Sequence, residues 1–136
     1  MNYLLDTNVC IALINRSSDS VRRKFDRALG AGSRFFVPSV AMFELWFGTF
    51  KSARLAFNTK RLQDFLEGPI TVLGFDEDDA RTSGSIRAAL KLAGKPIGTY
   101  DILIAGQALN RNLTLVTANV SEFSRVKNLS WQDWSS

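Results

Sequence analysis

The sequence predicts an α/β fold in which helices flank both faces of a central parallel β-sheet. Short, near-continuous apolar runs alternate along the 136-residue chain with longer segments whose apolar residues recur at helical spacing. Continuous apolar runs are typical of strands buried on both faces, as in parallel sheets covered by helices. No internal repeat, low-complexity run or Pro/Gly-rich linker interrupts this pattern, so we expect residues 1–136 to form one domain.

The first half of the chain reads as alternating strands and helices with recognisable ends. Asp6-Thr7-Asn8 directly follows an apolar strand, and residues of these types favour helix N-termini. Gly30 ends the second helix, and Pro38 closes the second strand before Ser39 caps the next helix. The predicted elements are a strand at Tyr3–Leu5, a helix after Asp6-Thr7-Asn8, a helix at Asp19–Leu29, a strand at Arg34–Val37, a helix from Ser39 to near Gly48, and a helix over 52–67.

The second half continues the alternation. The run Asp76–Asp79 has the residue types of a helix N-terminus, and we interpret it as capping on a solvated surface. Gly94-Lys95-Pro96 ends the long helix that follows. The predicted elements are a strand at Ile70–Leu73, helices from Asp76 to about Ala93 and from about Thr99, a strand at Leu113–Val116, and a helical turn near 119–125.

Composition excludes several kinds of chemistry. The chain has no His, which rules out a Ser-His-Asp triad, a Cys-His pair and an HExxH zinc site. The single Cys10 excludes an intramolecular disulfide and fits a reducing compartment. The N-terminal stretch has Asp6 within its apolar residues and no basic region before them, unlike a signal peptide or a membrane span. We therefore expect a cytoplasmic protein without a membrane partner.

Positive charge is concentrated in one third of the chain. Residues 16–61 hold ten basic and three acidic side chains, whereas residues 71–136 hold seven of each sign. A basic region of this kind suits a polyanionic partner such as nucleic acid. Solvated helix faces that keep the protein soluble explain the same charges equally well.

Polar side chains that can bind metal follow the predicted strands. In open α/β sheets, functional groups collect at the carboxyl ends of the strands. Asp6 directly follows the first strand, Glu44 lies in the apolar helix after the second, and Asp101 lies in the first turn of a helix. Asn119 follows the last predicted strand, with Glu122 one helical step further on.

Three convergent carboxylates would suppress one another's ionisation unless a cation compensated their charge. Oxygen ligands without His or Cys select Mg²⁺ or Mn²⁺, which can activate water against a phosphodiester. Other interpretations remain for individual residues. Asp6 and Asp101 could be ordinary helix N-terminal carboxylates, Asn119 a turn residue, and Thr7 either a cap or a hydrogen-bond donor to a ligating carboxylate.

Five segments together resemble the PIN-domain nucleases, and most closely the VapC toxins of bacterial toxin–antitoxin pairs. The likeness extends from Tyr3 to Trp134. The segments are Leu4–Asn8, the Glu44 helix after Val37-Pro38-Ser39, Pro96–Ala105, Leu115–Phe123 and Leu129–Trp134.

The resemblance implies a PIN-like domain, a homodimer, and a Mg²⁺-dependent endoribonuclease inhibited by a VapB-type antitoxin. It implies that Asp6, Glu44 and Asp101 are the metal-binding and catalytic acids. Many PIN nucleases carry a fourth acid where this chain has Asn119, so Asn119, Glu122 and Thr7 are accessory candidates.

The stretch Gly98-Thr99-Tyr100-Asp101 is similar to that of toxins that cut initiator tRNA in the anticodon loop. The resemblance further implies that an extended antitoxin segment places a basic side chain among the carboxylates. Operator DNA would then be bound through the antitoxin alone.

Two other function classes compete with a nuclease. A receiver-type phosphoacceptor needs paired acids at the first strand and a lysine after a late strand, and the chain has neither. A catalytically degenerate PIN fold that binds RNA or protein is favoured only by Asn119. Three retained carboxylates argue against it, because they repel phosphates unless a metal bridges them.

Overall fold

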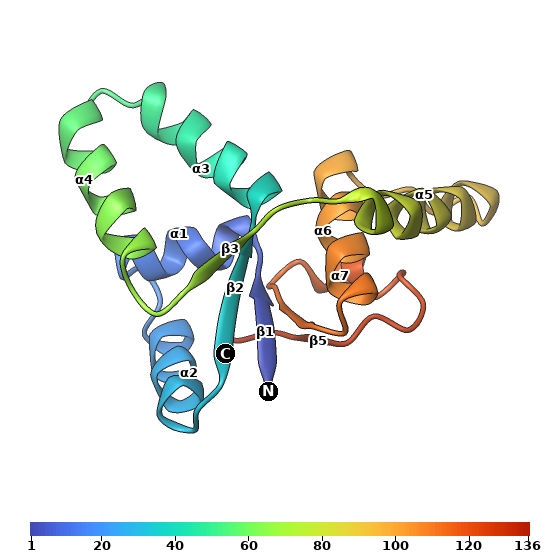
Figure 1. The fold of residues 1–136 in the computed structure, drawn as a ribbon, viewed down its shortest axis with the longest axis horizontal. Helices are drawn as coiled ribbons and strands as arrows, with labels where there is room; N and C mark the ends of the chain where they lie inside the picture. Colours follow the sequence, from blue (N-terminus) through green and yellow to red (C-terminus); the bar gives the residue numbers. More distant parts are fainter.

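A computed structural model describes residues 1–136 and contains a five-stranded, all-parallel sheet (Figure 1). The strands lie in the order β3-β2-β1-β4-β5. Their bounds are β1 (Asn2–Leu5), β2 (Arg34–Pro38), β3 (Thr71–Leu73), β4 (Thr114–Val116) and β5 (Trp131–Gln132). The chain builds the sheet outward from β1 in one direction and then in the other. The strand order therefore reverses between β1 and β4, the position at which such sheets form binding crevices.

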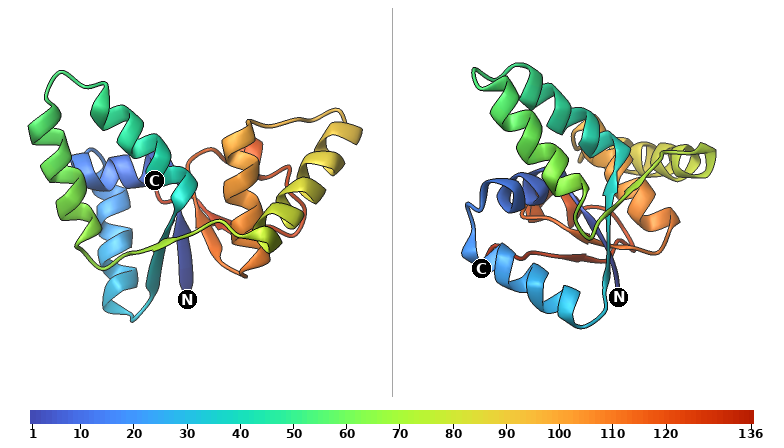
Figure 2. Two further views of the ribbon diagram at one scale, coloured as in Figure 1. Left: turned by 45° about the horizontal axis from the view of Figure 1, so that its top comes forward. Right: turned by 60° about the vertical axis from the view of Figure 1, so that its left-hand side comes forward.

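Helices cover both faces of the sheet, as the sequence predicts (Figure 2). Residues of α1 to α4 contribute to one apolar cluster, and residues of α5 to α7 contribute to a second cluster on the other face. The helices are α1 (Thr7–Asn15), α2 (Asp19–Gly30), α3 (Ser39–Phe50), α4 (Leu55–Leu66), α5 (Glu77–Leu92), α6 (Thr99–Asn110) and α7 (Val120–Phe123).

The two clusters explain why the inner residues of the central strands are apolar on both faces. Tyr3 and Leu5 belong to the α1–α4 cluster, whereas Leu4 between them belongs to the α5–α7 cluster. In β4, Leu115 and Val116 divide between the clusters in the same way. Successive side chains of a strand point to opposite faces, so a strand covered on both faces needs apolar residues throughout.

The predicted N-cap of α3 is wrong. The helix begins after Pro38, and no side chain caps its N-terminus, so Ser39 is not a cap. The predicted end near Gly48 agrees with the observed end at Phe50, and Thr49 beyond the glycine is buried in the protein interior. A helix-interior glycine costs only about 1 kcal/mol, which such packing can offset.

The prediction of a solvated Asp76–Asp79 run is half wrong. Asp76 and Asp79 do form a capping box at the start of α5. Asp79, however, is fully buried, and Arg111 Nη2 lies 2.9 Å from its Oδ2. The arginine comes from the end of α6, 32 residues away, so no local pattern could indicate that this acid is paired.

The last strand was not predicted. Trp131 and Gln132 pair with Leu115 and Val116 and form β5. Trp134 is buried, and its ring lies 5.1 Å from that of Tyr3 in an edge-on arrangement. No helix in the chain is long and apolar enough to span a membrane.

Candidate active site

The carboxyl ends of β1 and β4 position the first polar residues of the site. Asp6 extends the pairing of these strands by one residue, because its backbone N–H donates to Val116 O at 3.2 Å. Its side chain is 5% exposed and accepts a hydrogen bond from the Val9 N–H at 2.9 Å, so it also caps α1. The structural and the functional interpretations of Asp6 are therefore compatible.

Burial raises the pKa of Asp6, and the nearby charge of Glu44 raises it further. Hydrogen bonds from Thr117 and Val9 oppose this rise. Thr117 is completely buried directly after β4, and the sequence analysis did not identify it. Its position immediately after an apolar strand could have identified it, because side chains at the carboxyl ends of such strands lie at the functional site.

Glu44 reaches the site from α3 and is held by Thr7. The Thr7 hydroxyl donates to Glu44 Oε1 at 2.6 Å, a short, charge-assisted hydrogen bond. Thr7 thus donates to a carboxylate, while Asp6 takes the capping role; that Glu44 is a metal ligand stays a prediction. This bond fixes the orientation of a half-buried carboxylate that lies between apolar neighbours on its helix.

Asp101, Asn119 and Glu122 form the other half of the cluster. The Asn119 side-chain amide donates to Asp101 Oδ2 at 3.4 Å and to Glu122 Oε2 at 3.1 Å. Burial raises the pKa of Asp101 to about 7, and hydrogen bonding with Glu122 and the charges of Glu122, Asp6 and Glu44 contribute to the rise. The acids named in the sequence analysis therefore lie close enough to influence one another.

The donor set fits a hard divalent cation. It consists of carboxylate and amide oxygens, and the buried Cys10 is no alternative ligand because burial raises the pKa of its thiol. No three carboxylate or thiol side chains are close enough to enclose an ion by themselves. Mg²⁺ suits such an open arrangement, since it binds through one or two carboxylates and keeps several waters.

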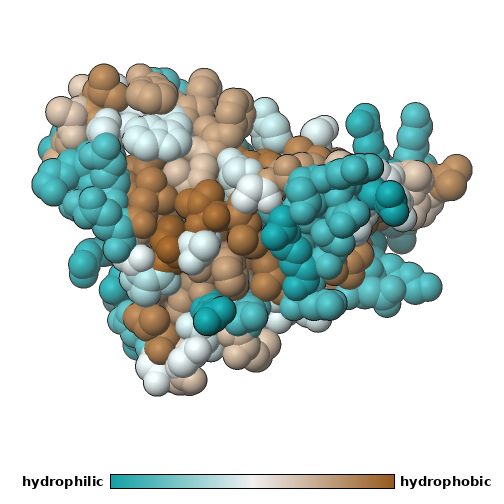
Figure 3. Space-filling model, viewed as in Figure 1, coloured by the Kyte–Doolittle hydropathy of each residue, from teal (hydrophilic) through white to brown (hydrophobic).

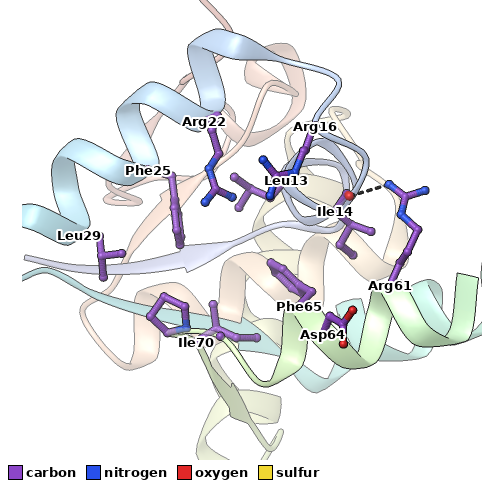
Figure 4. A pocket seen from close by; sticks show the side chains of 12 residues that line it. Leu13, Ile14, Arg16, Arg22, Phe25, Leu29, Arg61, Asp64, Phe65 and Ile70 are labelled. Atoms are coloured by element: carbon purple, nitrogen blue, oxygen red, sulfur yellow. Dashed lines mark hydrogen bonds between the residues drawn. The ribbon is translucent and has the colours of Figure 1, made fainter.

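A groove lies between α1, α2 and α4, and none of the candidate acids lines it (Figure 4). The groove has a volume of about 420 Å³, with Leu13, Phe25 and Phe65 among its apolar lining residues. A second, smaller pocket lies on the other side of Ile14 and Arg61, and Glu44 lines it. Arg61 donates to Ile14 O at 2.6 Å, so this hydrogen bond stands between the groove and the pocket beside Glu44.

A parallel α/β sheet with clustered acids at the reversal of its strand order defines the class of open α/β proteins whose functional site lies at the carboxyl edge of the sheet. The PIN domain matches residues 3–129. The tRNA(fMet)-specific endonuclease VapC of Shigella flexneri is 38% identical over 135 residues, with 99% of each chain covered. Ribonuclease VapC2 of Rickettsia felis is 34% identical over 134 residues, with 98% of each covered. The chain belongs to the PIN-domain family and, within it, to the VapC ribonucleases.

Solved structures agree with this assignment. The chain superposes with a TM-score of 0.91 on a chain of VapBC2 from Rickettsia felis bound to a promoter DNA fragment, at 33% identity and 98% and 99% coverage. It superposes with a TM-score of 0.89 on a chain of DNA-bound VapBC from Salmonella typhimurium, at 34% identity and 98% coverage of both chains. The predicted PIN-like α/β fold is confirmed.

Proposed function

We propose that this protein is a divalent-metal-dependent endoribonuclease toxin that cuts initiator tRNA in the anticodon loop and is inhibited by a VapB-type antitoxin. The observation that carries the proposal is the cluster of Asp6, Glu44, Asp101, Asn119 and Glu122, where the pKa of Asp101 reaches about 7. The Shigella and Salmonella relatives named as tRNA(fMet)-specific endonucleases support the tRNA substrate.

Asp6, Glu44 and Asp101 would hold Mg²⁺ or Mn²⁺. An ion held there would supply an activated water for attack on the phosphodiester and positive charge to stabilise the developing negative charge on the phosphate. Thr7 keeps Glu44 oriented through its 2.6 Å hydrogen bond, and Asn119 holds Asp101 and Glu122 together. Near neutral pH and without a cation, Asp101 is partly protonated, because burial and the adjacent acids raise its pKa to about 7.

Cleavage of total tRNA tests the activity. Purified wild type should cut tRNA with Mg²⁺ and not with EDTA, and Asp101→Asn should not cut under either condition. Mapping the new ends should locate the cut in the anticodon loop of initiator tRNA. If initiator tRNA stays intact while another RNA is cut, the substrate proposal is wrong. If folded, antitoxin-free protein cuts no RNA, the binding-only alternative replaces the nuclease.

The antitoxin would occupy the groove shown in Figure 4, which combines an apolar floor with Arg16, Arg22 and Arg61. Apolar residues are also exposed near the centre of the molecule in Figure 3. An antitoxin segment that continues from this groove past Ile14 and Arg61 into the neighbouring pocket would reach Glu44, where a basic side chain would pair with the acids in place of metal. The similar VapBC structures from Rickettsia felis and Salmonella typhimurium support such a complex.

We infer that operator DNA is bound through the antitoxin and that the active protein is a homodimer. The isolated toxin should bind DNA weakly and with strong salt dependence, since phosphate contacts alone give sequence-independent binding. Tight, sequence-selective operator binding by the toxin without antitoxin would contradict this inference. Light scattering measures the mass of the isolated toxin, and a monomer at all working concentrations would contradict the homodimer.

A further inference from the structure

The smaller pocket beside Glu44 has a volume of about 220 Å³ and lies between α1, α3 and α4. This volume is below the range of pockets that hold drug-sized ligands, and it suits a single ring system. The buried side chains of Leu45 and Leu62 form part of its wall. A group that enters this pocket therefore contacts apolar surface and one of the candidate acids together.

The α3 side of the pocket is open because residue 48 is glycine. Glu44, Leu45, Gly48 and Thr49 all line the pocket, and their spacing places them on one face of the helix. A Cβ atom at Gly48 would meet nothing within 4 Å, and the φ of this residue is not positive. Glycine within a helix is less stable than alanine, and here neither packing nor backbone conformation requires it. Space for a ligand accounts for the glycine.

Polar side chains of the pocket are held in fixed orientations. Asn58 Nδ2 donates to Ser52 Oγ at 3.0 Å, and Ser52 Oγ donates in turn to Thr49 O at 2.8 Å. Arg61 is held by its hydrogen bond to Ile14 O (Figure 4). The Asn58 amide oxygen can still accept, and the guanidinium of Arg61 has further N–H groups to donate. Amide and guanidinium groups are those that proteins use to bind the edges and faces of bases.

We propose that this pocket, which we call the α1–α3–α4 pocket, binds one unpaired nucleobase of the RNA next to the cleaved phosphate. It is lined by Glu44, Leu45, Gly48, Asn58, Arg61 and Leu62. The proposal rests on the proposed nuclease function and deepens it. A base has apolar faces and a hydrogen-bonding edge, which match the apolar wall and the polar groups of the pocket. Only a base turned out of a loop can enter, because bases in a duplex are paired and stacked.

An antitoxin side chain is the rival occupant of the α1–α3–α4 pocket. The antitoxin segment proposed above passes Ile14 and Arg61 on its way to Glu44, so it and the base would compete for this space. An apolar antitoxin side chain would leave the Asn58 acceptor and the Arg61 donors without partners, which is costly in a pocket closed to water. A base edge pairs with both. The observations thus favour a base in the free toxin.

Fluorescence anisotropy tests the pocket in an Asp101→Asn background, which prevents cleavage. The probe is a labelled single-stranded RNA with the sequence of the initiator tRNA anticodon loop, together with a series in which one residue at a time lacks its base. One abasic position should weaken binding about tenfold, because contacts to a single base contribute in this range. Gly48→Leu fills the pocket. It should bind the intact RNA about tenfold more weakly and should not distinguish it from that abasic RNA.

Gly84→Leu is the matched control, because Gly84 also lies within a helix and a Cβ atom there meets nothing within 4 Å. This variant should bind the intact and the abasic RNAs like the background. Gly48→Ala should raise the thermal unfolding temperature by a few degrees through its higher helix propensity, so a loss of RNA affinity cannot come from unfolding. With Asp101 restored, Gly48→Leu should still be stabilised by Mg²⁺, because the acids are unchanged.

Equal RNA affinity of Gly48→Leu and the background would overturn the proposal, as would an abasic series without a selective position. Weaker inhibition by antitoxin at unchanged RNA affinity would assign the α1–α3–α4 pocket to the antitoxin alone. Loss of Mg²⁺ stabilisation in Gly48→Leu would assign its effect to a displaced Glu44 and would equally overturn the proposal. The anisotropy experiment does not depend on cleavage, so failure of wild type to cut RNA would reject the proposed function separately.

Discussion

Asp6 and Asp101 hold their carboxyl groups in surroundings that oppose ionisation. Burial raises the pKa of both, and neighbouring acids add to the effect. A carboxyl group whose pKa is higher in the folded than in the unfolded chain binds more protons when folded, so folding stability falls as pH rises between the two values. For Asp101 this window extends from about 4 to about 7.

Asp101→Asn should therefore stabilise the metal-free protein while abolishing cleavage. In EDTA at pH 8, we expect a gain of about 1–2 kcal/mol in the free energy of unfolding, after allowance for solvent screening of a partly exposed group. At pH 4.5 the gain should nearly vanish, because wild-type Asp101 is then protonated. Urea denaturation at the two pH values measures both quantities.

The control for this prediction is Asp64→Asn, which removes an exposed carboxylate paired with Lys60 and should change stability little. Adding Mg²⁺ at pH 8 should stabilise wild type and leave Asp101→Asn nearly unaffected, because an ion that binds only the folded state stabilises it. A destabilised Asp101→Asn in EDTA would show that the acids do not repel one another as the geometry indicates.

At the scale of secondary-structure elements, α5 and α6 are joined by a buried ion pair. Burial alone would raise the pKa of Asp79, but hydrogen bonds from Arg111, the Asp76 backbone and Asn110 lower it to about 2. Gln107 Nε2 also donates to Asp79, at 3.2 Å. Three residues from the C-terminal end of α6 thus converge on one carboxylate near the start of α5 and hold the helix whose first turn carries Asp101.

Asp79→Asn should lower the free energy of unfolding by about 2 kcal/mol at pH 7. A depressed folded pKa contributes stability that is complete above the unfolded value of 3.8 and is lost as pH falls through about 2. The difference between wild type and Asp79→Asn should therefore shrink from pH 5 to pH 2 in denaturation experiments. Asp78→Asn, at an exposed position of the same turn, should show no comparable loss of stability. If the difference in free energy of unfolding between wild type and Asp79→Asn stayed constant from pH 5 to pH 2, the depressed pKa of Asp79 would not be its cause.

The same two helices approach closely at Gly106. A Cβ atom there would lie 1.9 Å from Ser83 Oγ and 2.9 Å from Ser83 Cα, so Gly106→Ala must force α5 and α6 apart. We expect a loss of about 1–3 kcal/mol by thermal or chemical denaturation. Ser83→Gly should restore only part of this loss, because it removes the clashing hydroxyl and Cβ of Ser83 while the backbone of α5 still lies too close.

Gly84 provides a matched control on α5. A Cβ atom at Gly84 meets nothing within 4 Å. Gly84→Ala should therefore leave stability unchanged or raise it by up to about 1 kcal/mol through higher helix propensity. If Gly106→Ala were as harmless as Gly84→Ala, the close approach of the two helices would not be needed for the fold.

Elements with strong local signals were predictable from sequence, and those that depend on distant contacts were not. The apolar runs of β1, β2 and β4 indicate their burial directly. The two-residue β5 has no such run and exists because its backbone pairs with β4. The burial of Asp79 depends on Arg111, a partner from another helix.

The same distinction applies to the candidate site. Asp6, Glu44 and Asp101 could be selected because the ends of parallel strands meet at one edge of the sheet. The structure places these acids close together, and their catalytic roles remain predictions. Thr117 and the groove were missed, because a threonine after a strand is common and a groove arises only when α1, α2 and α4 pack.

At the scale of the whole molecule, the groove and the cluster of candidate acids are separate surfaces. The groove is lined by residues of α1, α2 and α4, and none of the candidate acids lines it. Glu44 lines a neighbouring pocket that shares only Ile14 and Arg61 with the groove. A protein that must both cut RNA and be inhibited gains from this separation, since inhibition can be strengthened without altering the surface that binds RNA.

Leu29→Asp should separate these two properties. Leu29 lines the groove on α2 and is 39% exposed, so the substitution adds charge to the groove with little effect on the core. We expect tRNA cleavage at the wild-type rate, and at least about tenfold more antitoxin needed for half inhibition, because a charge in the apolar centre of an interface is costly. Titrating purified antitoxin into the cleavage reaction measures both values.

Leu92→Asp places the same charge on exposed α5 and should be inhibited like wild type. If Leu29→Asp were inhibited normally, the antitoxin would bind elsewhere; if it lost cleavage while remaining folded, the groove would serve RNA as well, and the two surfaces would not be independent.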